Sequence, residues 1–305
     1  MRKPVYLHQL YVFYHVAKYR SFSKAADVLC LTQPSVSAQI KILEDAYKTK
    51  LFERSGRRRI ELTDAGNILY TYVEKSLNLI KEAEGAVENT RGMKYGHIKI
   101  SAIPTLVSYY LPSIIERFRN AYSNIEIQLM GDFQENVIEN IVSFKADLGF
   151  IGKAISHESI AIERLWDEEL VIIVPPSHPF ATMKEVPLGQ IKDQPFILCE
   201  KGSGTRQIVD NLIKRKGILL RAVMEIGDNE AQKSVVAAGL GISIISSHVA
   251  RRDVEEGRLK VLRVTDEKLY RTFFAIHHKN KYITNTIKNF LRAVAEFPVQ
   301  EEIII

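Results

Sequence analysis

The sequence has few of the residues on which several large classes of protein depend. Its only cysteines, Cys30 and Cys199, form no CxxC motif and no disulfide framework, so a reducing compartment is the simpler setting. No apolar run approaches the roughly 20 residues that a membrane helix needs. Arg2 and Lys3 precede a polar helical stretch and not the apolar core of a secretion signal. We therefore expect a cytoplasmic protein without a membrane partner.

Catalytic signatures are missing as well. The sequence has no HExxH, GxSxG or GxGxxG pattern and no phosphate-binding GxxxxGK[ST] loop. His277 and His278 fall at the end of an expected strand and not on a helix face, and the isolated His157 and His178 are typical of surface or packing positions. We expect no enzyme activity, no catalytic residue, no metal site and no cofactor.

Positive charge is concentrated at one end of the chain. Residues 1–64 carry twelve lysines and arginines against six aspartates and glutamates, whereas the remaining residues carry thirty of each. The formal net charge of +6 therefore belongs to the N-terminal segment. This distribution is typical of a nucleic-acid-binding domain joined to a domain with another task.

The stretch from Ser21 to Leu62 indicates how that charge would meet DNA. Ser21 or Ser23 can cap a short helix and Thr32 a second one, whose apolar stripe is Val36, Ile40 and Leu43. The opposite face is short, polar and free of carboxylates before Glu44, so it can enter a major groove. An arginine-rich glycine turn between two short strands forms a basic wing. The residues expected at double-stranded DNA are Ser23, Thr32, Gln33, Pro34, Ser35, Ser37, Ala38, Lys41, Arg54, Arg57 and Arg58.

These residues resemble a known family. The run SFSxAAxxLxxTQPxVSxxIxxLE from Ser21 to Glu44, followed by LFxR at 51–54 and LTxAG at 62–66, is similar to the LysR-type transcriptional regulators. Tyr47 departs from the pattern, since the family usually has a helix-ending glycine there. Ala38 stands where many members carry arginine. The alternative is a helical module of this shape that binds protein, and the basic wing and the carboxylate-free face disfavour it.

A long helical pattern runs from Asp64 to Asn89. Its spacing alternates between four and three, which predicts a seam for pairing with another helix: Leu69, Val73, Ser76, Ile80, Ala83 and Val87. A helix lying on its own domain would show a similar pattern. The resemblance implies that this helix pairs two subunits, and because members are usually tetramers we expect a homodimer or homotetramer. A glycine-punctuated hinge at 90–96 follows.

After Gly96 short β-runs alternate with helical stretches, which predicts parallel sheets covered by helices. The expected strands are 97–102, 125–130, 147–152, 170–175, 196–199, 223–226, 241–245, 259–264 and 272–277. The expected helices include 111–121, 136–144, 205–216, 230–238 and 283–297. The resemblance implies two α/β lobes, like a periplasmic binding protein, with a crossover near Ile160 and a return near Thr265.

The expected fold is therefore α/β, with an N-terminal, all-α-type winged helix-turn-helix over residues 1–63. A linker helix and hinge over 64–94 lead to an effector-binding domain over 95–305. Lobe I of that domain comprises about 95–160 plus 266–305, and lobe II about 161–265.

Open α/β sheets bind ligands beyond the carboxyl ends of their strands, where helix N-termini meet. The segment GSGTR, 202–206, follows such a strand, and its glycines, hydroxyls, N–H groups and arginine suit a carboxylate, sulfate or phosphate. Similar segments occur in effector domains of the resembled family, although an ordinary capped helix would also fit. Cys199 beside it is either a small buried residue or, as in one branch of the family, a redox sensor. The residues expected at the effector are Thr105, Gly152, Ser203, Gly204, Thr205, Arg206 and Asn229.

Together these features predict a sequence-specific DNA-binding transcription regulator, modulated by a small anionic metabolite bound between the two lobes. Two other interpretations stay open at this point. A solute-binding protein on the same lobes would leave the basic segment unexplained. An enzyme fused to a DNA-binding domain would need a catalytic constellation, and the sequence suggests none.

Overall fold

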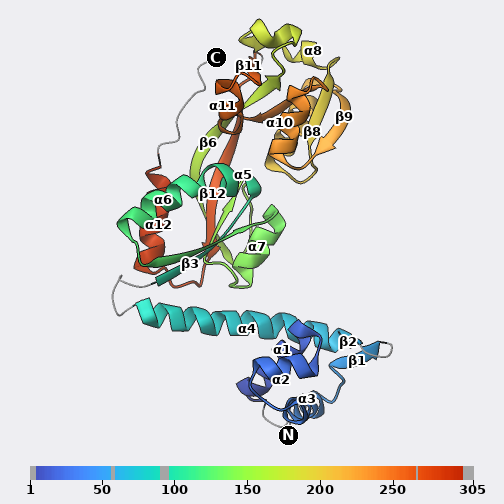
Figure 1. Ribbon diagram of the computed structural model, residues 1–305, viewed down its shortest axis with the longest axis vertical. Helices are drawn as coiled ribbons and strands as arrows, with labels where there is room; N and C mark the ends of the chain where they lie inside the picture. The colour runs from blue at the N-terminus through green and yellow to red at the C-terminus, as the bar shows by residue number, and fades with distance from the viewer. Residues whose placement is uncertain (1–4, 56–58, 90–95, 266, 298–305) are drawn as a thin grey trace. The chain divides into compact units, whose positions relative to one another are not determined.

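The computed structural model describes residues 5–55, 59–89, 96–265 and 267–297 (Figure 1). The chain divides into two compact units, one formed by Met1–Val87 with Ser143–Lys145 and a second one formed by Glu88–Val142 with Ala146–Ile305. The predicted hinge at 90–96 lies outside the described residues except for Gly96. Within the described ranges, no helix is both long enough and apolar enough to span a membrane.

The first unit has a small helical core. It is formed by α1 (Leu7–Tyr19), α2 (Phe22–Val28) and α3 (Gln33–Tyr47). Of the two candidate caps for α2, Ser21 is the one that accepts a backbone N–H, and Thr32 caps α3 as predicted. Val36, Ile40 and Leu43 are buried, which confirms the predicted stripe. The helix-turn-helix thus forms from local signals, caps and one apolar face.

The chain between α3 and the wing is held by a buried carboxylate. Helix α3 continues through Tyr47 and ends at Lys48, which takes the left-handed conformation (φ 54°) that glycine usually occupies. The Glu44 carboxylate accepts the N–H of Leu51 at 3.0 Å and the ammonium of Lys50 at 2.8 Å. The predicted wing follows as the antiparallel strands β1 (Phe52–Ser55) and β2 (Arg59–Leu62).

Helix α4 (Asp64–Asn89) has the predicted limits, but its apolar residues fall on two faces. Val73 and Leu77 are buried against the helical core, with Leu69 at its edge. The exposed face carries other large apolar side chains, 48–69% exposed: Ile68, Tyr72, Leu79 and Val87. The predicted seam is therefore wrong for Leu69 and Val73, because these two side chains pack on the domain that precedes the helix.

Within its described residues, the second unit contains one mixed sheet of ten strands. The strands are β3 (Gly96–Ala102), β4 (Ile125–Gly131), β5 (Leu148–Ile151), β6 (Ile160–Val174), β7 (Glu185–Val186), β8 (Pro195–Cys199), β9 (Arg221–Ile226), β10 (Ile242–Ser246), β11 (Lys260–Val264) and β12 (Leu269–His278). The order is β4-β3-β5-β12-β6-β10-β8-β9, with β11 on β6 and β7 on β11. Strands β3, β4 and β5 pair in parallel, as do β8, β9 and β10.

The long strands β6 and β12 carry the chain between two lobes (Figure 1). They run in opposite directions, because one leaves the first lobe and the other returns to it, and they pair antiparallel from Leu269↔Leu170 to His278↔Ile160. Strand β6 is also antiparallel to β10 and β11, and β12 to β5. The prediction of parallel sheets is thus wrong for the crossover strands β6 and β12, which make the sheet mixed.

Helices cover both faces of the sheet in each lobe. In lobe I they are α5 (Pro104–Tyr109), α6 (Leu111–Ala121), α7 (Gln134–Val142) and α12 (Asn285–Ala295). In lobe II they are α8 (Leu188–Ile191), α9 (Gly204–Lys216), α10 (Asn229–Ala237) and α11 (Ser247–Glu255), with a 3₁₀ turn at Pro179–Thr182. Neighbouring residues such as Phe150 and Ile151, or Ile172 and Ile173, belong to different core clusters, as period-2 alternation requires.

Candidate effector site and DNA-facing helix

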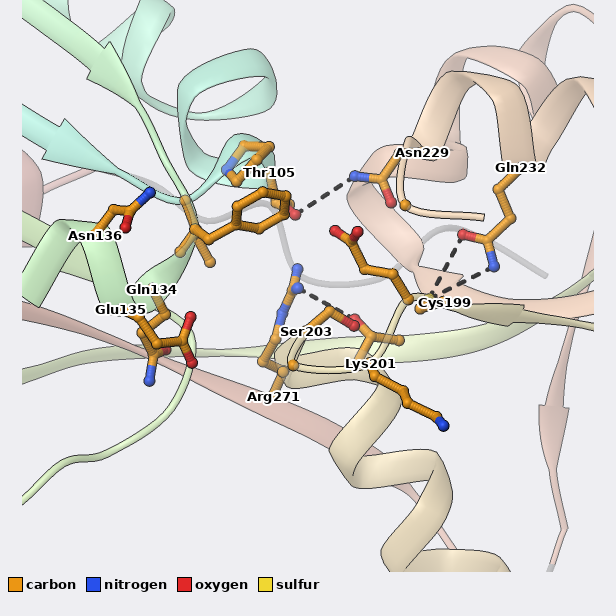
Figure 2. A pocket seen from close by; sticks show the side chains of 18 residues that line it. Thr105, Gln134, Glu135, Asn136, Cys199, Lys201, Ser203, Asn229, Gln232 and Arg271 are labelled. Carbon is orange, nitrogen blue, oxygen red and sulfur yellow. Dashed lines mark hydrogen bonds between the residues drawn. The ribbon is translucent and has the colours of Figure 1, made fainter. Parts of the chain in front are cut away.

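A cavity of about 350 Å³ lies between the two lobes of the second unit (Figure 2). Lobe I contributes the first turns of α5 and α7. Lobe II contributes the loop from β8 to α9 and the first turn of α10, and Arg271 comes from the crossover strand β12. The size is at the lower end of the range for ligand pockets, which suits a small metabolite.

The GSGTR segment brings the N-terminus of α9 to this cavity. The Ser203 hydroxyl accepts the N–H of Arg206 at 3.1 Å, and Gly202 has a φ of 94°, which favours glycine in the preceding turn. The N–H groups of Gly204 and Thr205 are first-turn donors that an α-helix cannot use itself. Ser203, Gly204 and Thr205 all line the cavity.

Two residues expected at the effector do not line the cavity. Arg206 turns away, with Nε on the Asp210 carboxylate at 2.9 Å and Nη1 on the Glu225 carboxylate at 3.0 Å. Gly152 lies beneath the α9 turn, where a Cβ added to Gly204 would come within 3.0 Å of the Gly152 carbonyl oxygen. Direct contact of Arg206 or Gly152 with a ligand is therefore not supported.

Thr105 and Asn229 face each other from different lobes (Figure 2). Asn229 Nδ2 donates to Thr105 Oγ1 at 3.4 Å, a long hydrogen bond that links the start of α10 to the start of α5. Asp228 caps α10 by accepting the N–H of Ala231 at 2.7 Å. The first-turn N–H groups at Asn229 and the next residue therefore have no acceptor within the helix.

Arg271 connects the cavity to the crossover strands, and the sequence pattern did not reveal it. Its Nη1 donates to Thr205 Oγ1 at 3.2 Å, while Nε and Nη2 donate to the Glu168 carboxylate. Glu168, only 3% exposed, also accepts from the hydroxyls of Tyr110 in lobe I and Ser246 in lobe II. Burial, with the nearby carboxylate, raises the pKa of Tyr110, so its hydroxyl stays a donor.

Cys199 lines the cavity, but its thiol has little of the character of a redox sensor. Burial raises the pKa of Cys199, and the hydrogen bond to Gln232 opposes this only in part. Because the thiolate is the reactive form, a raised pKa slows oxidation at neutral pH. The thiol is half-buried and hydrogen-bonded to Gln232, which favours a small packing residue over a redox sensor.

Helix α3 presents its polar face to solvent in the first unit. The exposed residues expected at DNA are Ser23, Thr32, Gln33, Pro34, Ala38 and Lys41, and Ser35 and Ser37 are half-buried. Arg57 and Arg58 lie outside the described residues. For Arg54 only the backbone, in β1, is described.

Models of two protein domains match the chain. Residues 7–67 match the bacterial regulatory helix-turn-helix protein of the lysR family, and residues 91–298 match the LysR substrate binding domain. The chain belongs to the LysR family of transcriptional regulators. LysR regulators are DNA-binding proteins with an effector-binding domain and are not enzymes. The enzyme and solute-binding alternatives are thereby set aside.

Similarity to known LysR regulators extends over nearly the whole chain. The RuBisCO operon transcriptional regulator of Allochromatium vinosum is 32% identical, covering 92% of this chain and 92% of its own length. The uncharacterized HTH-type transcriptional regulator YeiE of Escherichia coli K12 is 35% identical, covering 93% and 95%. The crystal structure of full-length CbnR complexed with its target DNA has a TM-score of 0.72 at 22% identity, covering 95% of this chain and 98% of that one. The expected fold class is confirmed.

Proposed function

We propose that this LysR regulator reads specific DNA sequences through α3 and that a small anionic metabolite, bound between the lobes, modulates it. One observation carries the anionic character: the N-termini of α7, α9 and α10 border the same cavity. Each helix N-terminus carries roughly half a positive charge and a set of unused N–H donors. An anion placed among these three helix N-termini is stabilised by the partial charge and the N–H donors of each.

Side chains at these helix starts supply the remaining donors. Asn229 and Thr105 offer an amide and a hydroxyl from opposite lobes, and Ser203 stands at the cap of α9. Arg271 adds positive charge beside Thr205, although most of that charge is balanced by Glu168. Such a ligand would touch both lobes, so its binding favours one lobe arrangement over another.

Thermal-shift and calorimetric titration of the full chain with small oxyanions tests this proposal. A bound anion should raise Tm by mass action. At a ligand concentration of one hundred times Kd, it stabilises the folded state by about 2.7 kcal/mol. Asn229→Ala should weaken the anion at least about fivefold, because it removes one donor to a charged group. Asn211→Ala, an exposed position of α9 outside the cavity, is the matched control. Equal affinities in both variants would exclude the cavity as the anion site.

The regulator should work as an oligomer in the cytoplasm, where it meets DNA. The exposed apolar face of α4 that carries Ile68, Tyr72, Leu79 and Val87 is the surface we propose for pairing two copies, as a dimer or within a tetramer. Pairing there would leave α3 of each copy free for DNA, since its polar face belongs to another element.

A further inference from the structure

The cavity holds more negative charge than a simple anion site needs. Glu200, from the loop after β8, and Glu135, from α7, both line it beside Lys201 and Arg271. The charge of Arg271 is largely balanced by Glu168, and Lys201 extends away from the other labelled side chains in Figure 2. Across the described residues, neither the Glu200 nor the Glu135 carboxylate has a hydrogen bond or a cation partner.

The two carboxylates differ in position. Glu135 is exposed on the first turn of α7, where water can solvate it. Glu200 is half-buried, and its carboxylate lies so close to Gly227 that a Cβ added there would come within 2.5 Å of an Oε atom. Gly227 directly precedes the cap of α10, so Glu200 is held beside a helix N-terminus that we propose to bind the anion.

A bare anion in this place would face an unpaired carboxylate. It would repel Glu200 and displace the water that solvates it, and a charge left without a partner on burial is strongly unfavourable. A ligand that carries a hydroxyl, an ammonium or an acidic proton next to its anionic group removes both penalties, because that group donates to the carboxylate.

We infer that Glu200 determines specificity at this site and that the effector is a small oxyanion with an adjacent hydrogen-bond donor. The inference rests on the proposed anion site and narrows the class of its ligand. When a polar side chain of a binding site needs a hydrogen bond from the ligand, the site rejects analogues that lack the donor group. This discrimination is far stronger than an apolar contact provides. Glu200 therefore excludes fully ionised oxyanions that the helix N-termini alone would accept.

Two sources of this chemistry suit a cavity of about 350 Å³. One is an inorganic oxyanion that keeps a proton near neutral pH, and the other is an organic acid with a hydroxyl or amino group on the neighbouring carbon. Phosphate and sulfate form a matched pair for the first source, since sulfate has no proton to donate. Glycolate and acetate form a matched pair for the second.

Calorimetric titration of the full chain with these four probes tests the inference. We expect the donor-bearing member of at least one pair to bind about tenfold tighter or more. Glutamine is nearly isosteric with glutamate and its amide can donate a hydrogen bond. Glu200→Gln should therefore bind sulfate or acetate more tightly than wild type does, and the affinity ratio within that probe pair should fall below about threefold. Glu116→Gln, at an exposed position of α6 outside the cavity, is the matched control and should keep the wild-type ratio. Gly227→Ala keeps every charge but displaces the Glu200 carboxylate, and it should also reduce the ratio.

The outcomes distinguish a failure of the proposed role of Glu200 from a failure of the proposed anion site. Discrimination in one pair identifies the inorganic or the organic source. A wild-type ratio near one, or a ratio that Glu200→Gln and Gly227→Ala both leave unchanged, overturns the role of Glu200 while the anion site stands. No binding of any probe to wild type or to Glu200→Gln overturns the anion site itself, and the inference with it.

Discussion

Glu168 and Glu169 are consecutive residues of β6 that allow a controlled measurement of a buried ion pair. Each carboxylate accepts hydrogen bonds from two nitrogens of one arginine, Arg271 for Glu168 and Arg263 for Glu169. The first pair is almost fully buried, with side chains 5% and 2% exposed, whereas the second is 23% and 12% exposed. We expect Glu168→Gln to destabilise the effector domain far more than Glu169→Gln.

The magnitude follows from what each substitution leaves behind. Glu168→Gln leaves the guanidinium of Arg271 buried beside a neutral amide, and removing one partner of a buried pair costs about 3–5 kcal/mol. Tyr110 and Ser246 can still donate to the remaining side-chain oxygen, so they add little. The pair at Glu169 is partly hydrated, and its loss costs about 1 kcal/mol. For a domain of this size Tm falls about 2–4 °C per kcal/mol, so Glu168→Gln should lower it by about 6–20 °C.

Trp166 provides the assay, because it is the only tryptophan of the sequence and lies two residues before Glu168. Its ring is 5.6 Å from that of Tyr110 and 5.7 Å from that of Phe273, so its emission changes when this part of the domain unfolds. The double variant Glu168→Leu/Arg271→Met should lose less stability than Glu168→Gln does, because it leaves no charge buried without a partner. Equal midpoints of thermal unfolding for Glu168→Gln and Glu169→Gln would show that burial of the ion pair does not determine its contribution to stability.

Three further predictions concern DNA, assembly and the thiols. In anisotropy titrations, Gln33→Ala should weaken binding to the cognate site by about 1–3 kcal/mol more than binding to random DNA. Lys41→Ala should weaken binding to both and lower the salt dependence of log K by about one unit. Equal losses on both DNAs for Gln33→Ala would argue against base reading. Tyr72→Glu should reduce the oligomer mass in light scattering, because it places charge on the exposed α4 face; an unchanged mass would move the contact elsewhere. At neutral pH a thiol reagent should label exposed Cys30 before Cys199, whose pKa is raised by burial; single Cys→Ser variants assign the rates, and fast labelling of Cys199 would restore the redox interpretation.

Sequence-based prediction succeeded where the signal is local. The limits of α4 and α6, the stripe of α3 and the cap at Thr32 all depend on residues within one or two turns of each other. The prediction that Thr105, Ser203 and Asn229 share one cavity rests on the same kind of signal, because each follows a recognisable strand at the start of a helix. Parallel strands then bring such helix starts to one edge of a sheet.

Prediction failed where a residue depends on a partner far away in the chain. The first ten residues of β6, IAIERLWDEE, are too polar to suggest a strand, yet they pair with β12 about a hundred residues later. The buried charge of Glu168 is tolerated only because Arg271 meets it from that strand. Arg206 is different: Asp210, four residues on, was a local sign that its guanidinium would be engaged along the helix.

The contacts between the lobes differ in strength, and this difference indicates how a ligand could act. The network around Glu168 is charged, buried and shared by Tyr110 of lobe I and Ser246 of lobe II, so it resists rearrangement and can act as a pivot. The bond from Asn229 to Thr105 is neutral and 3.4 Å long, and bonds of its kind contribute only about 0.5–1.5 kcal/mol. An anion that replaces it with charge-assisted bonds to both lobes gains about twice that per bond. If an anion binds as proposed, this difference, close to the 1–3 kcal/mol typical of allosteric coupling, is the free energy with which it would shift the lobes. An anion held by lobe II alone would bind without regulating.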